Sequence, residues 1–410
     1  MREKCSVGVY PRRTPTIKVG ATVFMDNTIG IYIHIPFCVK KCPYCDFNSV
    51  ADANIPDNAY TVTMLKELAA RIEGEPPLAH KTLESIYIGG GTASLISPHN
   101  IKKLVHGIRK TFSDASPQEI TLEINPGTVT KDSLAAFKDA GINRLSIGIQ
   151  SFNDKTLKTL GRIHSAKDAV KCYEYAKMAG FDNIGIDLIF GIPDQSTDEW
   201  ERDLKKAVAL KPEHISAYNL TIEKGTPFFE LQKKGRLALP SEEEQVLMYE
   251  LAIDKLEEAG YKHYEISNFS LTGFESRHNM RYWSHKDYIG LGAGAHSYAS
   301  LPDWGIRQWN EPEPASYMRQ VNETGRAIAG EERLTKKEAL EEGIFLGLRR
   351  AAGINTDWFF KRFNMPLKDL YSSKIDELKT KGLLREDNAG SLILTRKGLL
   401  LSNEVISEFI

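Results

Sequence analysis

The sequence lacks the features that mark a membrane-spanning, secreted or nucleic-acid-binding protein. No uninterrupted apolar run approaches the roughly 18 residues needed to cross a bilayer, and no charged-then-apolar signal peptide opens the chain. The chain has 53 lysine and arginine residues and 54 aspartate and glutamate residues. The resulting net charge of -1 indicates neither a nucleic-acid nor a membrane-surface partner. With 41% hydrophobic and 26% charged residues among 410, the composition is typical of a soluble globular protein, which we expect in the cytoplasm.

Cysteine is scarce as well, with only five in the chain, and three of these fall within eight residues. An odd number with three clustered makes a poor disulfide framework and a good metal or redox site in a reducing compartment. Cys5 and Cys172 stand alone, and we expect each to be an incidental or buried thiol.

Short apolar runs alternate with amphipathic segments along the chain. Runs rich in Ile, Leu and Val, which we expect to be strands, lie at 31–35, 85–90, 120–125, 144–150, 183–191 and 214–220. Helix-like segments lie between them at 57–73, 97–112, 131–141, 165–180 and 196–210. This alternation predicts parallel strands covered by helices. Six such units indicate an α/β fold, an incomplete (β/α)6 TIM-like barrel.

Four parts of the chain differ in character. Residues 1–24 carry five basic side chains against one acidic, without clear periodicity, and are predicted to be an N-terminal extension outside the fold. We expect the barrel in 25–235 and a segment that completes it in 236–315. Residues 316–410 are predicted to form three helices, a strand pair and a final helix, as in a winged-helix-like domain. Its basic residues are interspersed with acidic ones, which favours a packing or lid role over DNA binding.

Polar residues stand at the ends of the predicted strands. Glu123 lies near the end of the third strand, Gln150 ends the fourth, and Asp187 lies within the fifth. Each taken alone has an ordinary structural explanation, such as a surface carboxylate or a salt-bridge partner. Because parallel barrels carry their function at the C-terminal ends of the strands, their alignment on one rim predicts a site there.

The clustered cysteines form the pattern C-x3-C-x2-C at Cys38, Cys42 and Cys45, directly after the first predicted strand. Thiolates suit an iron-sulfur cluster or zinc, and a loop this short folds around one compact group. Zinc would need a fourth ligand, for which His34 is the nearby candidate, although zinc modules usually pair ligands from two separate knuckles. On a four-iron cluster, three cysteines leave one iron open to bind a ligand.

A glycine run, GGGT at 89–92, follows the second predicted strand. Glycines let the backbone approach a ligand closely, but the Lys-Ser/Thr pair that completes a phosphate-binding P-loop is absent. A nucleoside triphosphate site is therefore not expected, and a purely structural tight turn remains the alternative.

The segment YIHIPFC with CPYC, the GGGT loop and the rim residues together resemble the radical S-adenosylmethionine (SAM) superfamily. The branch it resembles contains oxygen-independent coproporphyrinogen III oxidases and their haem-chaperone relatives, and the resemblance runs from about Tyr32 to the C-terminus. It implies a 4Fe-4S cluster on Cys38, Cys42 and Cys45, with SAM on the open iron and an electron donor for the cluster. The SAM contacts that it implies are Tyr32, Tyr44, Gly90, Gly91, Thr92, Glu123, Gln150, Arg162 and Asp187.

Two features bear on the branch. Genuine oxidases carry a further cysteine where this chain has Phe47, which puts porphyrinogen decarboxylation in doubt. The stretch RHNMRYW resembles the H-N-x-x-Y-W signature of the haem-chaperone branch, and the resemblance implies haem binding by His278, Asn279, Tyr282 and Trp283. An imidazole can ligate haem iron, and a Tyr-Trp pair can pack on the flat macrocycle.

Taken alone, the same motif is explained by a histidine that caps a loop and two aromatic side chains that fill a core. His263, His285 or His296 could serve as the iron ligand instead. The hypothesis from the sequence is a haem chaperone that binds a cluster, SAM and haem and passes haem to an acceptor protein. The alternatives are an oxygen-independent coproporphyrinogen III dehydrogenase and a zinc-stabilised binding module.

Overall fold

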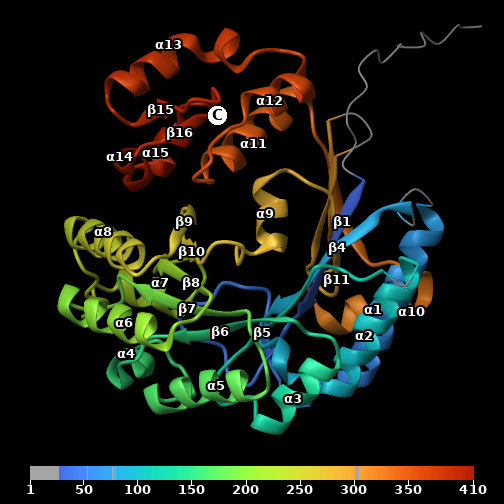
Figure 1. The fold of residues 1–410 in the computed structure, drawn as a ribbon. Helices are drawn as coiled ribbons and strands as arrows, with labels where there is room; N and C mark the ends of the chain where they lie inside the picture. The colour runs from blue at the N-terminus through green and yellow to red at the C-terminus, as the bar shows by residue number, and fades with distance from the viewer. Residues whose placement is uncertain (1–26, 53, 76–77, 79, 114, 301–303) are drawn as a thin grey trace, which may run out of the picture.

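One sheet of twelve strands forms the framework of the described chain (Figure 1). The computed structural model describes residues 27–52, 54–75, 78, 80–113, 115–300 and 304–410, so the predicted extension 1–24 and Cys5 lie outside the described residues. Seven neighbouring strands run parallel, namely β11 (Tyr288–Leu291), β1 (Thr28–Ile35), β4 (Thr82–Gly90), β5 (Glu119–Ile124), β6 (Arg144–Gln150), β7 (Ile184–Phe190) and β8 (His214–Asn219). The predicted incomplete barrel and its six strands are confirmed.

Antiparallel strands extend both edges of the parallel sheet. Next to β8 lie β10 (Asn268–Ser270) and β9 (Lys262–Glu265), and next to β11 lie β12 (His296–Ala299), β13 (Ile306–Asn310) and β14 (Ile328–Arg333). The strand β11 is a seventh parallel strand, which the sequence pattern did not predict. It has only four residues, too few to show a period.

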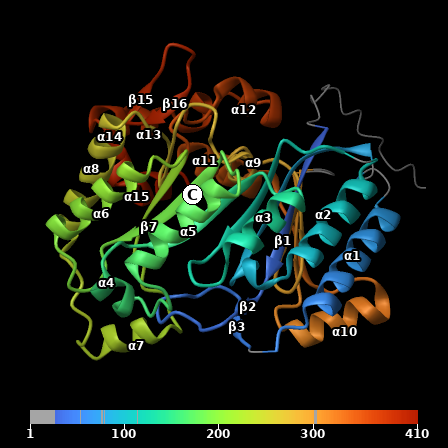
Figure 2. The ribbon, with the colours of Figure 1, turned by 60° about the horizontal axis from the view of Figure 1, so that its bottom comes forward.

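Helices cover the outer face of the parallel strands (Figures 1 and 2). The five predicted helices are confirmed as α1 (Asp57–Gly74), α2 (Pro98–Thr111), α3 (Lys131–Asp139), α5 (Ala166–Met178) and α6 (Thr197–Leu210). The sheet is further flanked by η2 (Ala93–Leu95), α4 (Asp154–Thr159), α7 (Pro227–Lys233), α8 (Glu242–Glu258), α9 (Arg277–Trp283) and α10 (Pro314–Thr324). The helices begin where the sequence offers caps: Ser97 accepts a hydrogen bond from Asn100 N before Pro98, and Ser196 forms a capping box with Glu199.

A second, smaller core lies in the C-terminal part of the chain. It contains α11 (Lys336–Leu348), α12 (Thr356–Phe363), α13 (Leu367–Thr380), β15 (Leu384–Glu386), β16 (Leu392–Leu394), α14 (Arg396–Leu400) and α15 (Ser402–Ser407). This is the predicted order of three helices, a strand pair and a terminal helical segment. Tyr317 and Val321 of α10 pack into the larger core, whereas Leu334 belongs to the smaller one. We therefore propose the domain border near Leu334 rather than at residue 316.

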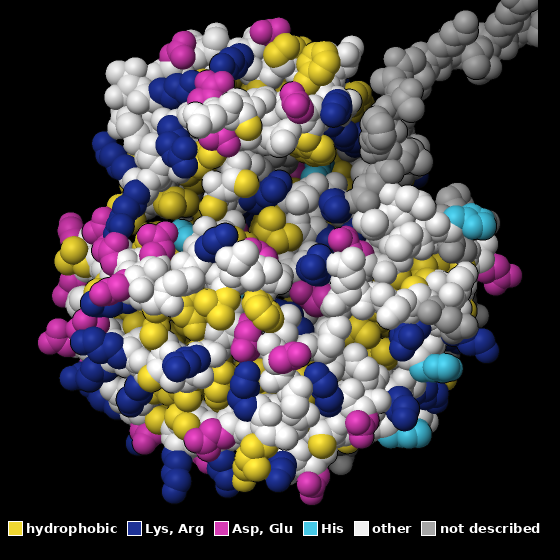
Figure 3. All heavy atoms as spheres, viewed as in Figure 1, with side chains coloured by type: hydrophobic (Ala, Val, Ile, Leu, Met, Phe, Trp, Pro, Cys, Tyr) yellow, Lys and Arg dark blue, Asp and Glu magenta, His cyan; other side chains and the backbone are white. Residues whose placement is uncertain are grey.

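Charges on the C-terminal unit are mixed. Figure 3 shows Lys and Arg side chains interspersed with Asp and Glu on the visible face of this unit, without a field of one sign. This distribution favours the predicted packing or lid role over DNA binding. Separately, none of the helices in the described ranges combines the length and the apolar character that a membrane span requires.

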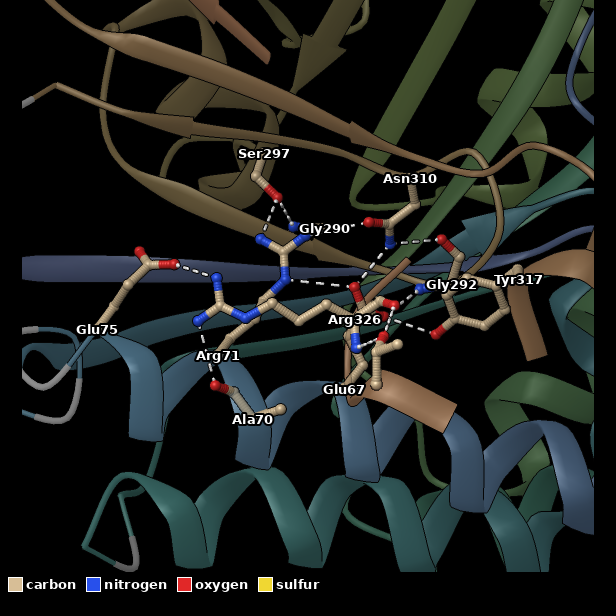
Figure 4. Close-up of polar contacts among 11 residues, drawn as sticks. Glu67, Ala70, Arg71, Glu75, Gly290, Gly292, Ser297, Asn310, Tyr317 and Arg326 are labelled. Atoms are coloured by element: carbon tan, nitrogen blue, oxygen red, sulfur yellow. Dashed lines mark hydrogen bonds and ion pairs between the residues drawn. The ribbon is translucent and has the colours of Figure 1, made fainter. Parts of the chain in front are cut away.

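A buried polar network ties α1 to the late strands and to α10 (Figure 4). Glu67, fully buried, accepts hydrogen bonds from Arg71 Nε at 3.3 Å, Asn310 Nδ2 at 2.7 Å, Tyr317 Oη at 2.6 Å and Gly292 N at 3.1 Å. Arg71 in turn donates to Asn310 Oδ1 at 3.1 Å. Because each partner in this network satisfies another away from water, the network holds α1 against β13 and α10.

Candidate functional site

The three clustered cysteines line one cavity of about 450 Å³ at the C-terminal ends of the parallel strands. Cys38 lies on the short strand β2 (Phe37–Cys38), which pairs with β3 (Val50–Ala51). A turn closed by Cys45 N donating to Cys42 O at 3.2 Å brings the other two thiols to the same wall. Burial raises the pKa of the Cys45 thiol, which favours the neutral thiol when no cation is bound. Cys172, which the sequence predicts to be an incidental or buried thiol, is buried on α5.

The glycine loop passes directly beside the first cysteine. A Cβ atom on Gly91 would lie 2.9 Å from Cys38 Sγ and 2.8 Å from Phe37 O, so only glycine fits there. Gly90 has a φ of 115°, a conformation that side chains rarely adopt. Thr92 donates to Cys38 Sγ at 3.6 Å. The glycine loop therefore lines the cavity without side chains that would fill it, which leaves room for a ligand beside the cysteines.

Two half-buried carboxylates face the same cavity. Glu123 accepts from Tyr87 Oη at 2.7 Å and from Gly90 N at 3.1 Å, and burial raises its pKa to about 7. Asp187 accepts from Ser216 Oγ at 2.7 Å, and burial raises its pKa too. Each carboxylate is thus held in place yet destabilised as an anion, an arrangement that favours a cationic or hydroxyl-rich ligand.

Arg162 connects the cysteine loop to the rim. Its Nη1 donates to Cys42 Sγ at 3.6 Å, and its Nη2 donates to Gly148 O at 3.0 Å and to Asn125 Oδ1. Asn125 donates in turn to Thr92 Oγ1 at 3.2 Å. Gln150, at a positive φ of 68°, ends β6 at this wall. The guanidinium offsets the negative charge that three thiolates bring together.

Residues from inside the strands complete the floor of the cavity, and the sequence prediction missed them. They are Arg144, Ser146, His214 and Ser216. Arg144 is 1% exposed, and its Nε has no hydrogen-bond partner among the residues described. The available signal was the presence of polar side chains within otherwise apolar strands, at RLSIGIQ and HISAYN.

Most predicted SAM contacts are brought together here. Tyr44, Gly90, Gly91, Thr92, Glu123, Gln150, Arg162 and Asp187 all line the cavity of the cysteines. Tyr32 does not. It lines a neighbouring cavity of about 560 Å³, and it is hydrogen-bonded to His34 Nδ1 at 2.9 Å. The two cavities share Phe47, Gly90 and Glu123 on their walls.

A zinc site completed by His34 does not fit this geometry. Both of its ring nitrogens are engaged, Nδ1 with Tyr32 Oη and Nε2 with Asn48 O at 2.8 Å. In the part of the chain that the structure describes, no three or more His, Cys, Asp or Glu side chains are gathered around the position of one single metal ion.

The four residues of the H-N-x-x-Y-W motif are divided between three places. Tyr282 and Trp283 line the second cavity, and Asn279 lines the first. His278 is fully buried behind them: its Nδ1 bonds Ser85 Oγ at 2.8 Å and its Nε2 bonds Tyr282 Oη at 2.9 Å. Burial lowers its pKa to about 3. The prediction that His278 ligates haem iron meets a direct obstacle, because neither ring nitrogen is free to do so.

Two protein-family models match parts of this chain. The family model described as "Radical SAM superfamily" matches residues 32–207, and that described as "HemN C-terminal domain" matches residues 334–401. The fold, the cysteine loop and these matches together define a radical SAM protein, a class for which a 4Fe-4S cluster and SAM are implied.

Similar proteins indicate which branch of the radical SAM superfamily this chain resembles. "Heme chaperone HemW" of Bacillus subtilis is 38% identical over 382 residues, covering 92% of this chain and 98% of that protein. HemW of Lactococcus lactis is 38% identical over 379 residues, covering 92% and 96%. The chain belongs to the HemW family of the radical SAM superfamily. A solved structure of coproporphyrinogen III oxidase HemN from Escherichia coli has the same fold, with a TM-score of 0.78, 23% identity, and coverage of 95% of this chain and 91% of that one.

Proposed function

We propose that this protein is a haem chaperone, which binds haem and passes it to an acceptor protein in the cytoplasm. The observation that carries the proposal is the second cavity, walled by Tyr282 and Trp283 and joined to the cysteine cavity. Its volume of about 560 Å³ suits a drug-sized ligand. The similarity to HemW proteins over almost the whole chain supports the same function.

The proposed cofactors follow from the first cavity. Cys38, Cys42 and Cys45 would hold three irons of a 4Fe-4S cluster, and SAM would occupy the fourth iron and the wall of Gly91, Glu123 and the rim residues. When bound, the cluster supplies an electron to SAM, which an external electron donor must replace. The protein's part is to position SAM by backbone and carboxylate contacts and to balance charge with Arg162.

The test of the function compares haem transfer with porphyrinogen oxidation. The cluster is reconstituted anaerobically, and haem is titrated while Soret absorbance is followed. A parallel sample receives coproporphyrinogen, SAM and a reductant. We expect saturable haem uptake, release to an apo-haem protein, and no protoporphyrinogen. Formation of protoporphyrinogen would instead support the dehydrogenase, despite Phe47, which is 60% exposed on the shared wall.

Glu123 should make SAM binding depend on pH. An ionised carboxylate attracts the SAM ammonium, and burial raises the pKa of this carboxyl to about 7. Raising the pH through that value ionises Glu123, so SAM affinity should rise about tenfold between about pH 6 and pH 8. Below pH 7, SAM binding should release a proton. The measurement is calorimetric SAM titration of the cluster-loaded protein in buffers of different ionisation enthalpy.

The Glu123→Gln protein should bind SAM more weakly at about pH 8 and lose the pH dependence, because the amide has no charge while its oxygen can still accept from Gly90 N. Glu174→Gln, at an exposed position of α5, is the matched control. An unchanged pH profile in Glu123→Gln would contradict the assignment.

A further inference from the structure

The second cavity holds three histidines that could reach a bound macrocycle. It lies between β1, α9 and α11, where α9 is set between the sheet and the C-terminal unit (Figure 1). Its aromatic walls are Tyr32, Tyr282, Trp283, Tyr288 and Tyr298. Arg349 stacks on Trp283 at 4.6 Å from the ring centroid and holds it in place. A flat aromatic ligand would find ring contacts on several sides.

Two of these histidines, His34 and His285, already contact other side chains or backbone groups of the protein. His34 has both ring nitrogens hydrogen-bonded. His285 stacks on Tyr298 with ring centroids 4.5 Å apart, and its Nε2 lies 3.3 Å from Glu342 Oε2. Either one would have to give up a contact before it could bind iron, and both are buried, at 7% and 8% exposure.

His296 differs from them in each respect. It is exposed at the start of β12, and within the described chain neither of its ring nitrogens has a hydrogen-bond partner. Trp309 on the adjacent strand β13 lies alongside its ring, with centroids 6.0 Å apart and an interplanar angle of 28°, which orients the imidazole. Of the three histidines on this cavity, it is the one whose ring nitrogen can bind a metal without first breaking a hydrogen bond or an ion pair.

We propose that His296 is the axial ligand of haem iron in the second cavity, with Tyr282 and Trp283 packing on the macrocycle. This inference rests on the proposed haem-chaperone function and names the ligand that the motif histidine cannot supply. Partial burial and the neighbouring Arg307 lower the pKa of His296, which keeps the imidazole neutral as a ligand must be. His278 then has a positioning role: its hydrogen bond holds Tyr282 at the cavity wall.

The experiment titrates the full-length, cluster-loaded protein with ferric haem and records absorption and electron paramagnetic resonance spectra. Wild type should give a histidine-ligated spectrum. His296→Ala should lose that signature and bind haem at least about tenfold more weakly, since one good metal ligand contributes of the order of 1.4 kcal/mol or more. Free imidazole added to His296→Ala should restore the wild-type spectrum, a rescue that a misfolded variant would not show.

Control variants distinguish failure of the ligand assignment from failure of the proposed haem-chaperone function. His99→Ala, an exposed histidine on α2, should leave the haem spectrum unchanged. A His278→Phe protein should keep histidine ligation even where affinity falls. If wild type binds haem and His296→Ala gives the same spectrum, the ligand assignment is overturned while the haem chaperone stands. If wild type takes up no haem, the proposed function itself fails.

Discussion

Cys42→Ala is expected to leave the protein without its cluster. Anaerobic reconstitution of wild type should incorporate about four irons and four sulfides per chain, whereas the variant should retain fewer than about one of each. With Cys42 removed, only two cysteine thiolates remain for a 4Fe-4S cluster whose fourth iron has no protein ligand, which is too few to retain it. The variant should also lose measurable SAM binding, because the open iron is part of the SAM site.

Cys172→Ala is the matched control for this experiment. Cys172 is a buried thiol on α5, outside the lining of the cysteine cavity, so its removal should leave iron and sulfide content unchanged. Uptake of zinc in place of iron by the wild-type protein, with the same loss in Cys42→Ala, would contradict the cluster and favour a zinc-stabilised module.

Glu67→Ala should produce the largest loss of stability of the changes considered. Its carboxylate accepts four hydrogen bonds in the network of Figure 4, and its removal leaves Arg71, which is 3% exposed, without its buried counter-charge. Breaking a buried pair by removing one partner costs about 3 to 5 kcal/mol. The first unfolding transition in urea should move to lower concentration by a corresponding amount.

The control for Glu67 lies on the same helix. Glu73 is exposed on α1, and Glu73→Ala should change the free energy of unfolding by no more than about 0.5 kcal/mol. Equal midpoints for Glu67→Ala and Glu73→Ala would show that the buried network contributes no net stability.

The sequence predicted the barrel because its strands are buried on both faces. Continuous apolar runs separated by capped amphipathic helices leave few other arrangements. The same reasoning located the cysteines, the glycine loop and Glu123 on one rim, since strand ends converge by topology. Asp187 and Gln150 line the same cavity for the same reason.

What the sequence could not show depends on orientation within the fold. His278 and Trp283 are five residues apart on one short helix, yet the first faces inward to Ser85 and the second faces a cavity. His296 reaches that cavity only because β12 turns back along β11 in an antiparallel pair. A motif names residues, whereas the direction of each side chain follows from the packing of α9 between two cores.

Phe47, Gly90 and Glu123 line both cavities, so we expect ligands bound in the two cavities to be thermodynamically linked. If SAM and haem occupy them together, any factor by which SAM changes haem affinity must equal the factor by which haem changes SAM affinity. We expect the charge on Glu123 to carry that coupling, since the proposed SAM site favours the ionised form of a carboxyl group that also lines the second cavity. Haem delivery would then depend on whether SAM is bound. If SAM strengthens haem binding, loss of SAM promotes haem release; if SAM weakens haem binding, loss of SAM retains the haem.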